Sequence, residues 1–357
     1  MNKIQFVPFS VKEFHAGSKA LSDVADIADI AGFQRICVDR KEYGNSFINK
    51  IYSLVWWLKS CLWLLRIPRN AIVLINYPTK VLSGRLGVMF LRAVRNKLNA
   101  RLLAVVHDIS ALRGRAPACE NGIEGPLNEL IKLSSRLIVH NELMKQWLEN
   151  HGVATKKMVV LGVFDYLLKN RPSPKYATLP INNVAIAGNL NAEKAAYLCS
   201  LNKVPYIQWQ IYGVNYDANT VYGDNVFYNG AYPPDVLPEK LNAHFGLVWD
   251  GSSIDTCEGY MGEYLSYNNP HKLSLYLASG LPVIVWKKSA LSDWILQRGL
   301  GIAVESLYEI PNVLKDMPIS GYNNMLANVE LVSRKLQTGH YMKTAIEFAV
   351  ELIQKEI

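Results

Sequence analysis

The sequence has few cysteines, and none of them has the spacing of a metal site. Five cysteines are scattered over 357 residues, without a C-x-x-C pair or a Cys/His cluster. The pattern argues against zinc motifs and is typical of reduced thiols in a cytoplasm. We therefore expect no bound metal and a cytoplasmic protein. Because Met1-Asn2-Lys3 runs straight into the strand-like Ile4-Gln5-Phe6-Val7, we also expect no secretory signal.

The short motifs of several enzyme classes are missing as well. The sequence contains no G-x-x-x-x-G-K-[ST], no G-x-S-x-G and no G-x-G-x-x-G. ATP hydrolysis, serine hydrolysis and dinucleotide-dependent redox chemistry therefore lack their best sequence support. A D-x-D arrangement, which would hold a metal on a sugar nucleotide, is not evident either.

Acidic residues are too few to balance the basic ones. The chain has 38 Lys and Arg against 30 Asp and Glu, a formal net charge of +8. Such an excess suits polyanionic partners, namely nucleic acid, phosphorylated substrates or anionic lipid. We do not expect nucleic acid, because neither an aromatic RNA-binding signature nor a helix-turn-helix pattern is evident. A mildly basic surface without a polyanionic partner is an equal alternative.

No hydrophobic run is both long and uncharged enough for a membrane span. The most apolar segment, 51–67, carries Lys59 in its middle and Arg66 near its end. One interpretation is a core helix or a helix in a homo-oligomer interface. The other is peripheral contact with the inner face of a membrane, where tryptophans lie at the interface and cations meet anionic head groups. A lipid-linked acceptor would give such contact a purpose.

Short apolar runs and amphipathic stretches alternate along the first half of the chain. Helical patterns occupy 20–31 and 81–98, among others. This alternation predicts parallel βαβ units. Two prolines in Asn170-Arg171-Pro172-Ser173-Pro174-Lys175 then interrupt the periodicity and indicate a linker. The predicted strands of this half are 4–8, 35–38, 71–75, 102–106, 136–139 and 158–161.

The alternation restarts after the linker, so the fold class is α/β with two Rossmann-like domains facing each other across a cleft. The domains we expect are 1–168 and 183–338, joined by a linker at 169–182 and followed by a closing helical segment at 339–357. Pro311 argues against a helix beyond the first turn of 306–315. Strands are predicted at 183–187, 206–212, 226–228, 245–249 and 282–286, and the further helices at 271–278, 289–298 and 341–356.

Candidate ligand-binding residues follow the strands of the second half. Ligands of open α/β sheets bind outside the carboxyl ends of the strands. Gly188 and Asn189 end one strand, and Lys194 lies one turn into the next helix, where a phosphate could bind. Tyr212 and Gly213 end the following strand and could meet a base or ribose. Plain turn chemistry is the alternative for each group.

The segment 262–277 holds the largest group of candidates. Asn269 can cap a helix whose first position suits Pro270, which would bring free N–H groups, Lys272 and Ser274 to one helix end. A diphosphate can bind there without a metal. An ordinary solvated helix lysine is the alternative for Lys272.

Three neighbouring side chains complete the predicted donor-binding set. Asp250 closes the preceding strand, and its carboxylate suits sugar hydroxyls. Asn268 and His271 flank the predicted start of the helix.

The first half offers a candidate base. His107 and Asp108 follow the strand 102–106, and either could remove a proton from an acceptor hydroxyl, with Arg113 nearby on the acceptor side. A pair that only hydrogen-bonds a loop is the alternative. The loop His15-Ala16-Gly17-Ser18-Lys19 follows the first strand. We place His15 on the acceptor side, and Gly17 and Ser18 near the donor phosphates.

These motifs resemble a family of bacterial GT-B hexosyltransferases. The family includes the β-1,6-galactofuranosyltransferases of O-antigen synthesis and the glucosyltransferases that extend glycans on streptococcal serine-rich adhesins. The C-terminal matches are the specific ones, and the others spread over nearly the whole chain. The matching segments are 107–109 with 112–114, 164–167, 187–190, 212–216, 245–251, 262–265, 268–272 and 281–286.

The resemblance implies a UDP-linked donor bound by the C-terminal domain, an acceptor met by the N-terminal domain and a final helix that crosses back to the first domain. Carried over by position, Lys272 and the helix start at Asn269 hold the diphosphate, Tyr212 and Asn189 line the nucleotide pocket, and Gly17 approaches it. Leu273 stands where the family pattern has threonine. The enzyme would need no cofactor beyond its donor substrate.

The function that the resemblance implies is transfer of a hexose to a saccharide acceptor in bacterial surface-glycan synthesis. Galactofuranose is favoured and glucose comes next, because the segments 164–167 and 254–257 are nearer to the galactofuranosyl branch. Two alternatives are a non-catalytic GT-B-shaped partner subunit and a sugar-nucleotide epimerase. Retention of Lys272 and of Asn269-Pro270 argues against the first, and product analysis would exclude or establish the second.

Overall fold

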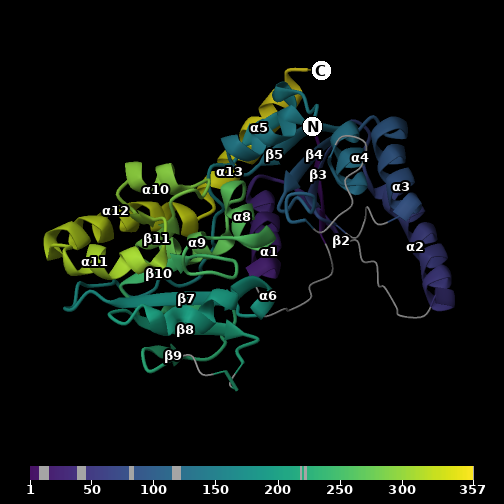
Figure 1. Cartoon of the computed structure of the whole chain (residues 1–357). Coiled ribbons are helices and arrows are strands. Elements are labelled where there is room, and N and C mark those ends of the chain that lie inside the picture. Colours follow the sequence, from purple (N-terminus) through teal and green to yellow (C-terminus); the bar gives the residue numbers. More distant parts are fainter. Residues whose placement is uncertain are drawn as a thin grey trace. The chain divides into compact units, whose positions relative to one another are not determined.

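The computed structural model describes residues 1–7, 16–37, 46–79, 84–114, 122–217, 219–220 and 223–356. These residues form two compact units (Figure 1). Unit 1 consists of Met1–Val11, Val24–Leu161 and Met342–Ile357, and unit 2 of Lys12–Asp23 and Gly162–Tyr341. Helix α1 (Ala16–Ile30) is therefore divided between the two units after Asp23.

Unit 1 is built on a parallel sheet of six strands in the order β2-β1-β3-β4-β5-β6. The central strands β3 and β4 are nearly completely buried, as expected for strands that are covered on both faces and read as continuous apolar runs. The strands are β1 (Lys3–Val7), β2 (Gln34–Cys37), β3 (Ile72–Tyr77), β4 (Arg101–Val106), β5 (Ser134–Val139) and β6 (Met158–Val160).

The helices of unit 1 follow from apolar periodicity and capping. The side chain of Asn141 accepts a hydrogen bond from the Met144 amide and so begins α5. In α13, six buried residues recur at helical spacing between Met342 and Ile353. Besides α1, the helices are α2 (Ser46–Arg66), α3 (Gly84–Lys97), α4 (Gly125–Leu133), α5 (Glu142–Asn150) and α13 (His340–Gln354).

The C-terminal helix belongs to the first unit, as predicted. Although α13 follows the whole of unit 2 in sequence, Met342–Ile357 packs with the first sheet. The Arg136 guanidinium at the start of β5 donates to both carboxylate oxygens of Glu356, at 2.7 and 3.1 Å. Such a two-pronged pair fixes direction as well as position. It therefore fastens the end of the chain to the sheet of unit 1.

Unit 2 contains a second parallel sheet of six strands, in the order β12-β11-β10-β7-β8-β9. Strand β7 pairs with both β8 and β10, so the strand order reverses between β7 and β10. This is the doubly wound arrangement, in which ligands bind at the point of reversal. The strands are β7 (Asn183–Asn189), β8 (Gln208–Val214), β9 (Val226–Tyr228), β10 (Phe245–Val248), β11 (Val283–Trp286) and β12 (Gly301–Val304).

Short helices connect these strands, and one long helix follows them. Helix α9 packs against both β10 and the long helix α12. The α-helices are α6 (Ala192–Ala195), α7 (Leu237–Lys240), α8 (Gly259–Glu263), α9 (His271–Ala278), α10 (Ser292–Gln297), α11 (Ile310–Lys315) and α12 (Ile319–Gln337). Segments of 3-10 helix are Thr155–Lys157, Tyr264–Ser266 and Leu307–Glu309, each of three residues, and the longer Ala196–Lys203.

Four features of unit 2 differ from the sequence predictions. Strand β12 and helix α12 were not predicted. Pro311 does not end a helix: it lies in the first turn of α11, where its missing N–H costs nothing. Asn269 does not cap α9, because Pro270 occupies the N-cap position and no side chain caps the helix.

Candidate functional site

Two lysines and one carboxylate meet at the carboxyl edge of the unit 2 sheet. Lys272 in the first turn of α9 donates from Nζ to Asp250 Oδ1 and to the Trp249 carbonyl, each at 2.8 Å. Lys194 in α6 has its Nζ 4.0 Å from the other carboxylate oxygen of Asp250. We call Lys194, Asp250 and Lys272 the Lys–Asp–Lys cluster. The sequence predicted all three as donor-binding residues, and the structure brings them together.

The Lys–Asp–Lys cluster lies where the strand order reverses. Asp250 follows β10 and Lys194 follows β7, and these two strands are neighbours in the sheet. The loops after two such strands part to opposite faces of the sheet and leave a crevice between them. The backbone supports this arrangement, because the Gly251 amide donates to the Lys194 carbonyl at 2.9 Å.

The charges of the Lys–Asp–Lys cluster are suited to binding an anion. The side chains of Asp250 and Lys272 are only 7% and 12% exposed, so each charge has little contact with water and is balanced by the other. Lys194 adds a second cation whose side chain is 30% exposed. Together the three groups carry one surplus positive charge. A phosphate that binds at this edge of the sheet could contact Lys272, which is held by Asp250, and Lys194, which is more accessible.

Glycine permits close backbone approach at the same edge. Gly188 of β7 pairs with Gly213 of β8, and Gly213 has φ of +148°. A Cβ atom on Gly213 would lie 1.8 Å from the Gly188 carbonyl oxygen. Beside this pair, Asn189 Oδ1 accepts hydrogen bonds from Asn215 Nδ2 at 2.7 Å and from the Asn191 amide. The strand ends are therefore tightly joined and bare of side chains at the glycines.

Two predicted donor-binding residues have structural partners in the segment after β6. Asn269 is buried and donates from Nδ2 to the Gly162 carbonyl at 3.0 Å. Ser274 is buried and its hydroxyl donates to the Phe164 carbonyl at 2.6 Å. These bonds hold the chain before the linker against α9. The sequence prediction of a side-chain cap failed because this long-range partner outcompetes the local one.

His271 and Asn268 place buried polar atoms beside the start of α9. Both ring nitrogens of His271 are buried, and its ring lies 5.1 Å from the ring of Tyr166. Burial, and to a smaller extent the Lys19 cation, lowers the pKa of His271 to about 3, so the imidazole is neutral at pH 7. The Oδ1 atom of Asn268 is buried and accepts no hydrogen bond from the described part of the chain.

A stacked pair of tyrosines near Gly213 was not among the predicted site residues. The rings of Tyr216 and Tyr228 lie 4.1 Å apart with an interplanar angle of 2°, and the Tyr228 hydroxyl donates to the Gly213 carbonyl at 2.9 Å. Their proximity depends on the pairing of β8 with β9, which the sequence alone does not reveal. The predicted Tyr212 is buried, and its hydroxyl accepts a hydrogen bond from the Asn242 amide at 3.1 Å.

In unit 1, the predicted acid–base pair lies at the carboxyl edge of β4. The ring of His107 contacts Asn76 through a 2.9 Å hydrogen bond between Nε2 and Oδ1. Asp108 accepts a hydrogen bond from Arg113 Nη1 at 3.0 Å. If Nε2 donates to the Asn76 oxygen, the lone pair of the imidazole is on Nδ1. Asn76 is the penultimate residue of β3, and a polar residue near the end of an otherwise apolar strand was the sequence feature that could have identified it.

A buried glutamate shapes the loop that follows His107 and Asp108. Glu124, only 4% exposed, accepts hydrogen bonds from the Tyr77 hydroxyl and from the amides of Ser110 and Ala111 at 2.8 to 3.2 Å. Burial and the neighbouring Glu124 carboxylate raise the pKa of Tyr77 far above its usual value, so the phenol stays a donor. Nothing in the local sequence singles out Glu124, because its partners lie in two other segments.

The remaining candidates in unit 1 and α1 are only partly placed. His15 lies outside the described residues. Gly17 and Ser18 lie in the first turn of α1. Further along this helix, Lys19 forms 2.8 Å ion pairs with Asp23 and Asp235.

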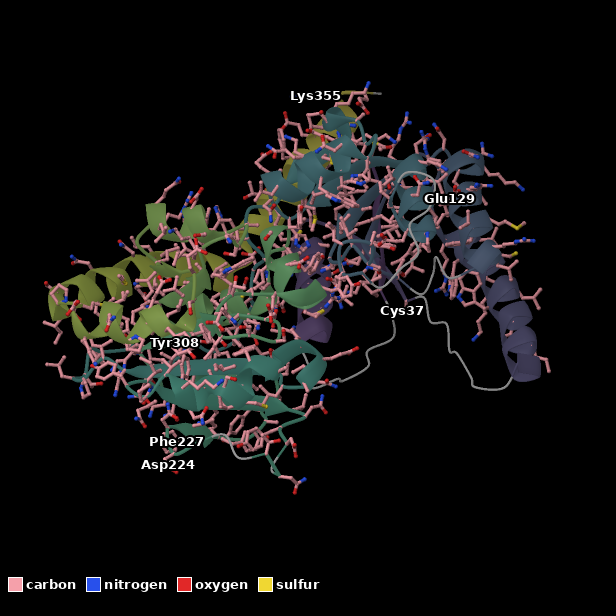
Figure 2. All side chains as sticks on the ribbon, in the orientation of Figure 1. Cys37, Glu129, Asp224, Phe227, Tyr308 and Lys355 are labelled. Atoms are coloured by element: carbon pink, nitrogen blue, oxygen red, sulfur yellow. The ribbon has the colours of Figure 1, made fainter. Side chains whose placement is uncertain are left out.

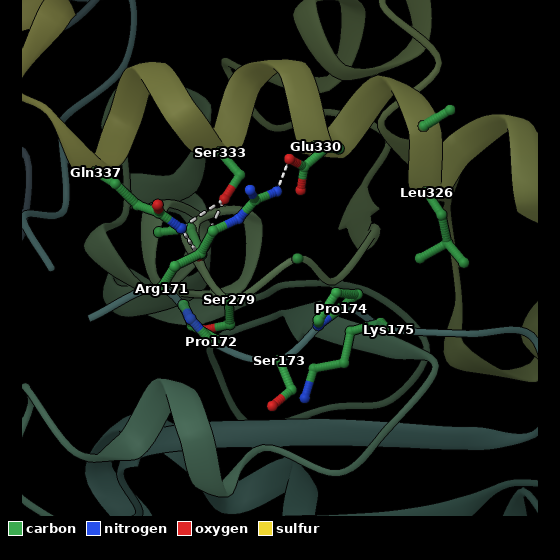
Figure 3. A pocket seen from close by; sticks show the side chains of 13 residues that line it. Arg171, Pro172, Ser173, Pro174, Lys175, Ser279, Leu326, Glu330, Ser333 and Gln337 are labelled. Carbon is green, nitrogen blue, oxygen red and sulfur yellow. Dashed lines mark hydrogen bonds and ion pairs between the residues drawn. The ribbon is translucent and has the colours of Figure 1, made fainter.

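A cavity of about 300 Å³ lies between the linker and two helices of unit 2 (Figure 3). Linker residues 171–175 line one side, and the end of α9 and one face of α12 line the other. Several of its polar groups have partners: Arg171 pairs with Glu330, and Gln337 donates to the Ala278 carbonyl and to Ser333. The cavity is at the opposite end of α9 from Lys272. We regard it as packing space beside the linker.

Comparison with known proteins identifies relatives that match nearly the whole chain. Models of the glucosyltransferase 3-like family match in two parts, the N-terminal domain over residues 7–163 and the C-terminal domain over residues 184–349. Beta-1,6-galactofuranosyltransferase WbbI of Escherichia coli K12 is 31% identical over 341 residues, covering 94% of each chain. Glucosyltransferase 3 of Streptococcus gordonii is 26% identical over 261 residues, 71% of this chain and 72% of the relative.

Solved structures agree on the fold. The structure of Anabaena HepE in complex with UDP and glucose has a TM-score of 0.60 at 11% identity and covers 98% of this chain and 100% of its own. The apo form of the lipopolysaccharide outer core galactosyltransferase WaaB has a TM-score of 0.59 at 14% identity, with 98% and 99% covered. Together with the two doubly wound sheets, these matches show that the chain has the GT-B fold and belongs to the glucosyltransferase 3-like family of glycosyltransferases.

Proposed function

We propose that the chain transfers galactofuranose from a UDP-linked donor to a saccharide acceptor in bacterial surface-glycan synthesis. The observation that carries the proposal is the Lys–Asp–Lys cluster at the point of strand reversal in unit 2. The choice of sugar rests on the relative that covers 94% of the chain, which is a galactofuranosyltransferase. The glucosyltransferase match is lower in identity and shorter, so glucose is the second candidate.

The donor diphosphate would bind the two lysines of the cluster. Lys272 is already oriented by Asp250 and the Trp249 carbonyl, and Lys194, whose side chain is 30% exposed, would turn toward a phosphate oxygen. The bare edge at Gly188 and Gly213 would allow the nucleotide to approach the backbone. The stacked rings of Tyr216 and Tyr228 beside that edge would suit the uracil ring, because every base offers a flat face for stacking.

We propose that this binding needs no metal ion. Two ammonium groups and the N–H groups of the first turn of α9 supply the positive charge that a divalent cation would otherwise supply. The same groups would stabilise UDP as it leaves. Chelation with EDTA should therefore leave donor binding and transfer unchanged.

The transfer step would be a direct displacement at the anomeric carbon. The acceptor hydroxyl oxygen attacks that carbon, its proton passes to His107 or Asp108, and the bond between the anomeric carbon and the diphosphate oxygen breaks to release UDP. The hydrogen bond to Asn76 supports His107 as the base, because it holds the imidazole ring in place and would leave Nδ1 as the acceptor if Nε2 donates. Asp108 would then hold Arg113 for contact with the acceptor.

A thermal-shift screen tests the donor. Purified protein is mixed with UDP, UDP-glucose, UDP-galactopyranose, UDP-galactofuranose, GDP-mannose and NAD, each with EDTA. Ligand that binds the folded state raises the melting temperature by mass action. We expect shifts with UDP and UDP-galactofuranose.

Two lysine variants connect the screen to the cluster. Lys194→Gln removes the accessible cation while Asp250 keeps Lys272 as its partner, so the fold should be retained. We expect UDP affinity to fall about tenfold, the value of one charge-assisted hydrogen bond. Lys203→Gln, an exposed lysine in the same unit, is the matched control and should bind UDP normally.

The two alternative functions predict other results, the epimerase in product analysis without an acceptor and the partner subunit in the thermal-shift screen. A sugar-nucleotide epimerase would convert a UDP-hexose in the absence of any acceptor. A non-catalytic partner subunit would be folded and show no shift with the UDP series. Either result would refute the proposed transferase.

A further inference from the structure

Helix α2 in unit 1 exposes an apolar stripe along one side. Ile51, Val55, Leu58, Leu62 and Leu65 are spaced alternately by four and three residues, which places them on one face of a helix. All five side chains are between 40% and 83% exposed. Single exposed apolar residues are ordinary, but five along one helix face mark an interaction surface. We call these five residues the α2 stripe.

The opposite side of α2 is what holds the helix to unit 1. Trp56 is buried, and its ring lies 5.9 Å from Trp63 and 6.1 Å from Phe90 of α3. In the sequence, Trp56 and Trp63 are separated by two turns, so they share the inner face. Figure 1 shows α2 beside α3. The α2 stripe is therefore not required for the core and remains available to a partner.

The charge around the stripe has one sign. Between residues 43 and 107 the sequence has ten Lys and Arg and no Asp or Glu, whereas the rest of the chain has 28 against 30. The basic excess of the whole chain thus comes from this segment. Lys59 and Arg66 directly follow Leu58 and Leu65, one step of about 100° further round the helix, and both are exposed. They form a basic border along one edge of the α2 stripe.

We propose that α2 lies flat on an anionic membrane surface. The α2 stripe would enter the boundary between head groups and acyl chains, and Lys59 and Arg66 would extend their apolar stems along it and place their charges at lipid phosphates. The described part of the chain has no helix that is long and apolar enough to cross a membrane. The helix axis therefore lies parallel to the membrane surface.

The same charges disfavour a second copy of the chain as the partner. Two α2 helices packed through their stripes would bring Lys59 and Arg66 of both copies together, and neither α2 nor α3 contains an acidic residue to pair with them. On α4, Glu129 (labelled in Figure 2) pairs with Arg92 of α3 at 2.6 Å. An anionic lipid surface supplies the missing negative charge.

Vesicle flotation of the full chain tests the proposal without donor or acceptor, so it does not depend on the transferase activity. We expect binding to phosphatidylcholine vesicles that contain phosphatidylglycerol, little binding to phosphatidylcholine alone, and release by high salt. The double variant Leu58→Ser/Leu62→Ser should abolish flotation. Leu331→Ser on α12, where the side chain is 64% exposed, is the control and should float like the wild type.

A charge variant separates the two parts of the surface. Lys59→Gln/Arg66→Gln should weaken binding about fivefold for each cation removed. Lys287→Gln/Lys288→Gln, which removes two exposed lysines from unit 2, should leave binding unchanged. Circular dichroism confirms that each variant is folded.

Three results would overturn the proposal. One is the absence of flotation with anionic vesicles. Another is equal loss of binding in the unit 2 control variants. The third is a stable oligomer in solution that Leu58→Ser/Leu62→Ser dissociates, because the α2 stripe would then be a subunit interface.

Discussion

The carboxyl edges of the two sheets bear polar groups of different kinds. In unit 2 the charges are buried and paired: Asp250 and Lys272 are 7% and 12% exposed and lie 2.8 Å apart. In unit 1 the corresponding pair, Asp108 and Arg113, is 39% and 22% exposed. Charges fixed in a poorly solvated position suit a ligand of constant charge, such as a diphosphate. Groups that remain accessible to solvent suit a step in which a proton is exchanged.

The largest effect we expect comes from removing the base in unit 1. Loss of a general base slows turnover by about 10²–10⁴-fold, while donor binding in unit 2 is untouched. His107→Ala should show this loss in kcat with unchanged UDP affinity, and Asp108→Asn should show a smaller one. His151→Ala, whose ring stacks on Trp147 in the same unit, is the control.

Transfer assays measure kcat, and calorimetric titration with UDP measures the UDP affinity. Near-normal kcat in folded His107→Ala and Asp108→Asn would mean that neither residue is the base. The accessible groups at the carboxyl edge of the unit 1 sheet would then have no role in proton transfer.

A comparable effect on stability is expected in unit 2. Asp250→Ala leaves Lys272 nearly buried without its carboxylate, and breaking a buried pair in this way costs about 3–5 kcal/mol of unfolding free energy. The matched variant Asp255→Ala removes an exposed carboxylate from the same loop and should cost less than about 1 kcal/mol. Urea unfolding measures both. Equal losses for the two variants would show that the pair is solvated.

Two glycines at the edge of the unit 2 sheet give a matched test of close packing. Gly213 and Gly230 both have φ in the left-handed region, but only a Cβ on Gly213 would clash with backbone, at 1.8 Å from Gly188. Gly230→Ala should cost about 1 kcal/mol from backbone conformation alone. Gly213→Ala should cost about 3 kcal/mol, because overpacking is added. Thermal and urea unfolding measure the loss of unfolding free energy in each variant. Similar losses in Gly213→Ala and Gly230→Ala would show that the strand ends separate easily.

The smallest effect we expect is a loss of stability at low pH, to which one buried histidine in each unit contributes. Burial lowers the pKa of His140 in unit 1 to about 4 and that of His271 in unit 2 to about 3, from 6.5 in the unfolded chain. A folded-state pKa below the unfolded one contributes stability that is present above pH 6.5 and is lost as the pH falls below it. At pH 5 each histidine should cost about 2 kcal/mol of unfolding free energy.

Urea unfolding at pH 7 and pH 5 measures this loss. His140→Gln and His271→Gln should each be less sensitive to pH than the wild type. If the wild type is equally stable at both pH values, the two rings are hydrated in solution.

The positions of most strands along the chain were predictable, because a parallel strand that is buried on both faces forms a separate apolar run in the sequence. The candidate site residues were predictable because they directly follow such runs. Strand β12 was not predicted, since the four residues Gly301–Val304 form too short an apolar run after the turn at Gly299 to stand out. Helix α12 begins after Pro318 with a polar stretch of weak helix propensity, and it is stabilised by packing on α9. Helix α12 therefore depends on a tertiary contact that cannot be predicted from its own sequence.

The site shows the same division between local and long-range information. Lys272 and Asp250 were predicted individually from their positions after strands, but their ion pair depends on how α9 packs beside β10. Asn76 becomes a partner of His107 only because β3 and β4 are neighbours. Asn269 was predicted to cap its own helix, yet it reaches Gly162, 107 residues away. Local chemistry was readable in the sequence, and pairings across the sheet were not.

The measurement that tests the central claim most directly is a transfer assay with UDP-galactofuranose, saccharide acceptors and EDTA, followed by mass spectrometry of the product. We predict that the wild type releases UDP and adds one hexose to an acceptor, that Lys194→Gln does so with weakened donor affinity, and that Lys203→Gln matches the wild type. Folded wild-type protein that neither binds nor consumes any UDP-hexose would contradict the account.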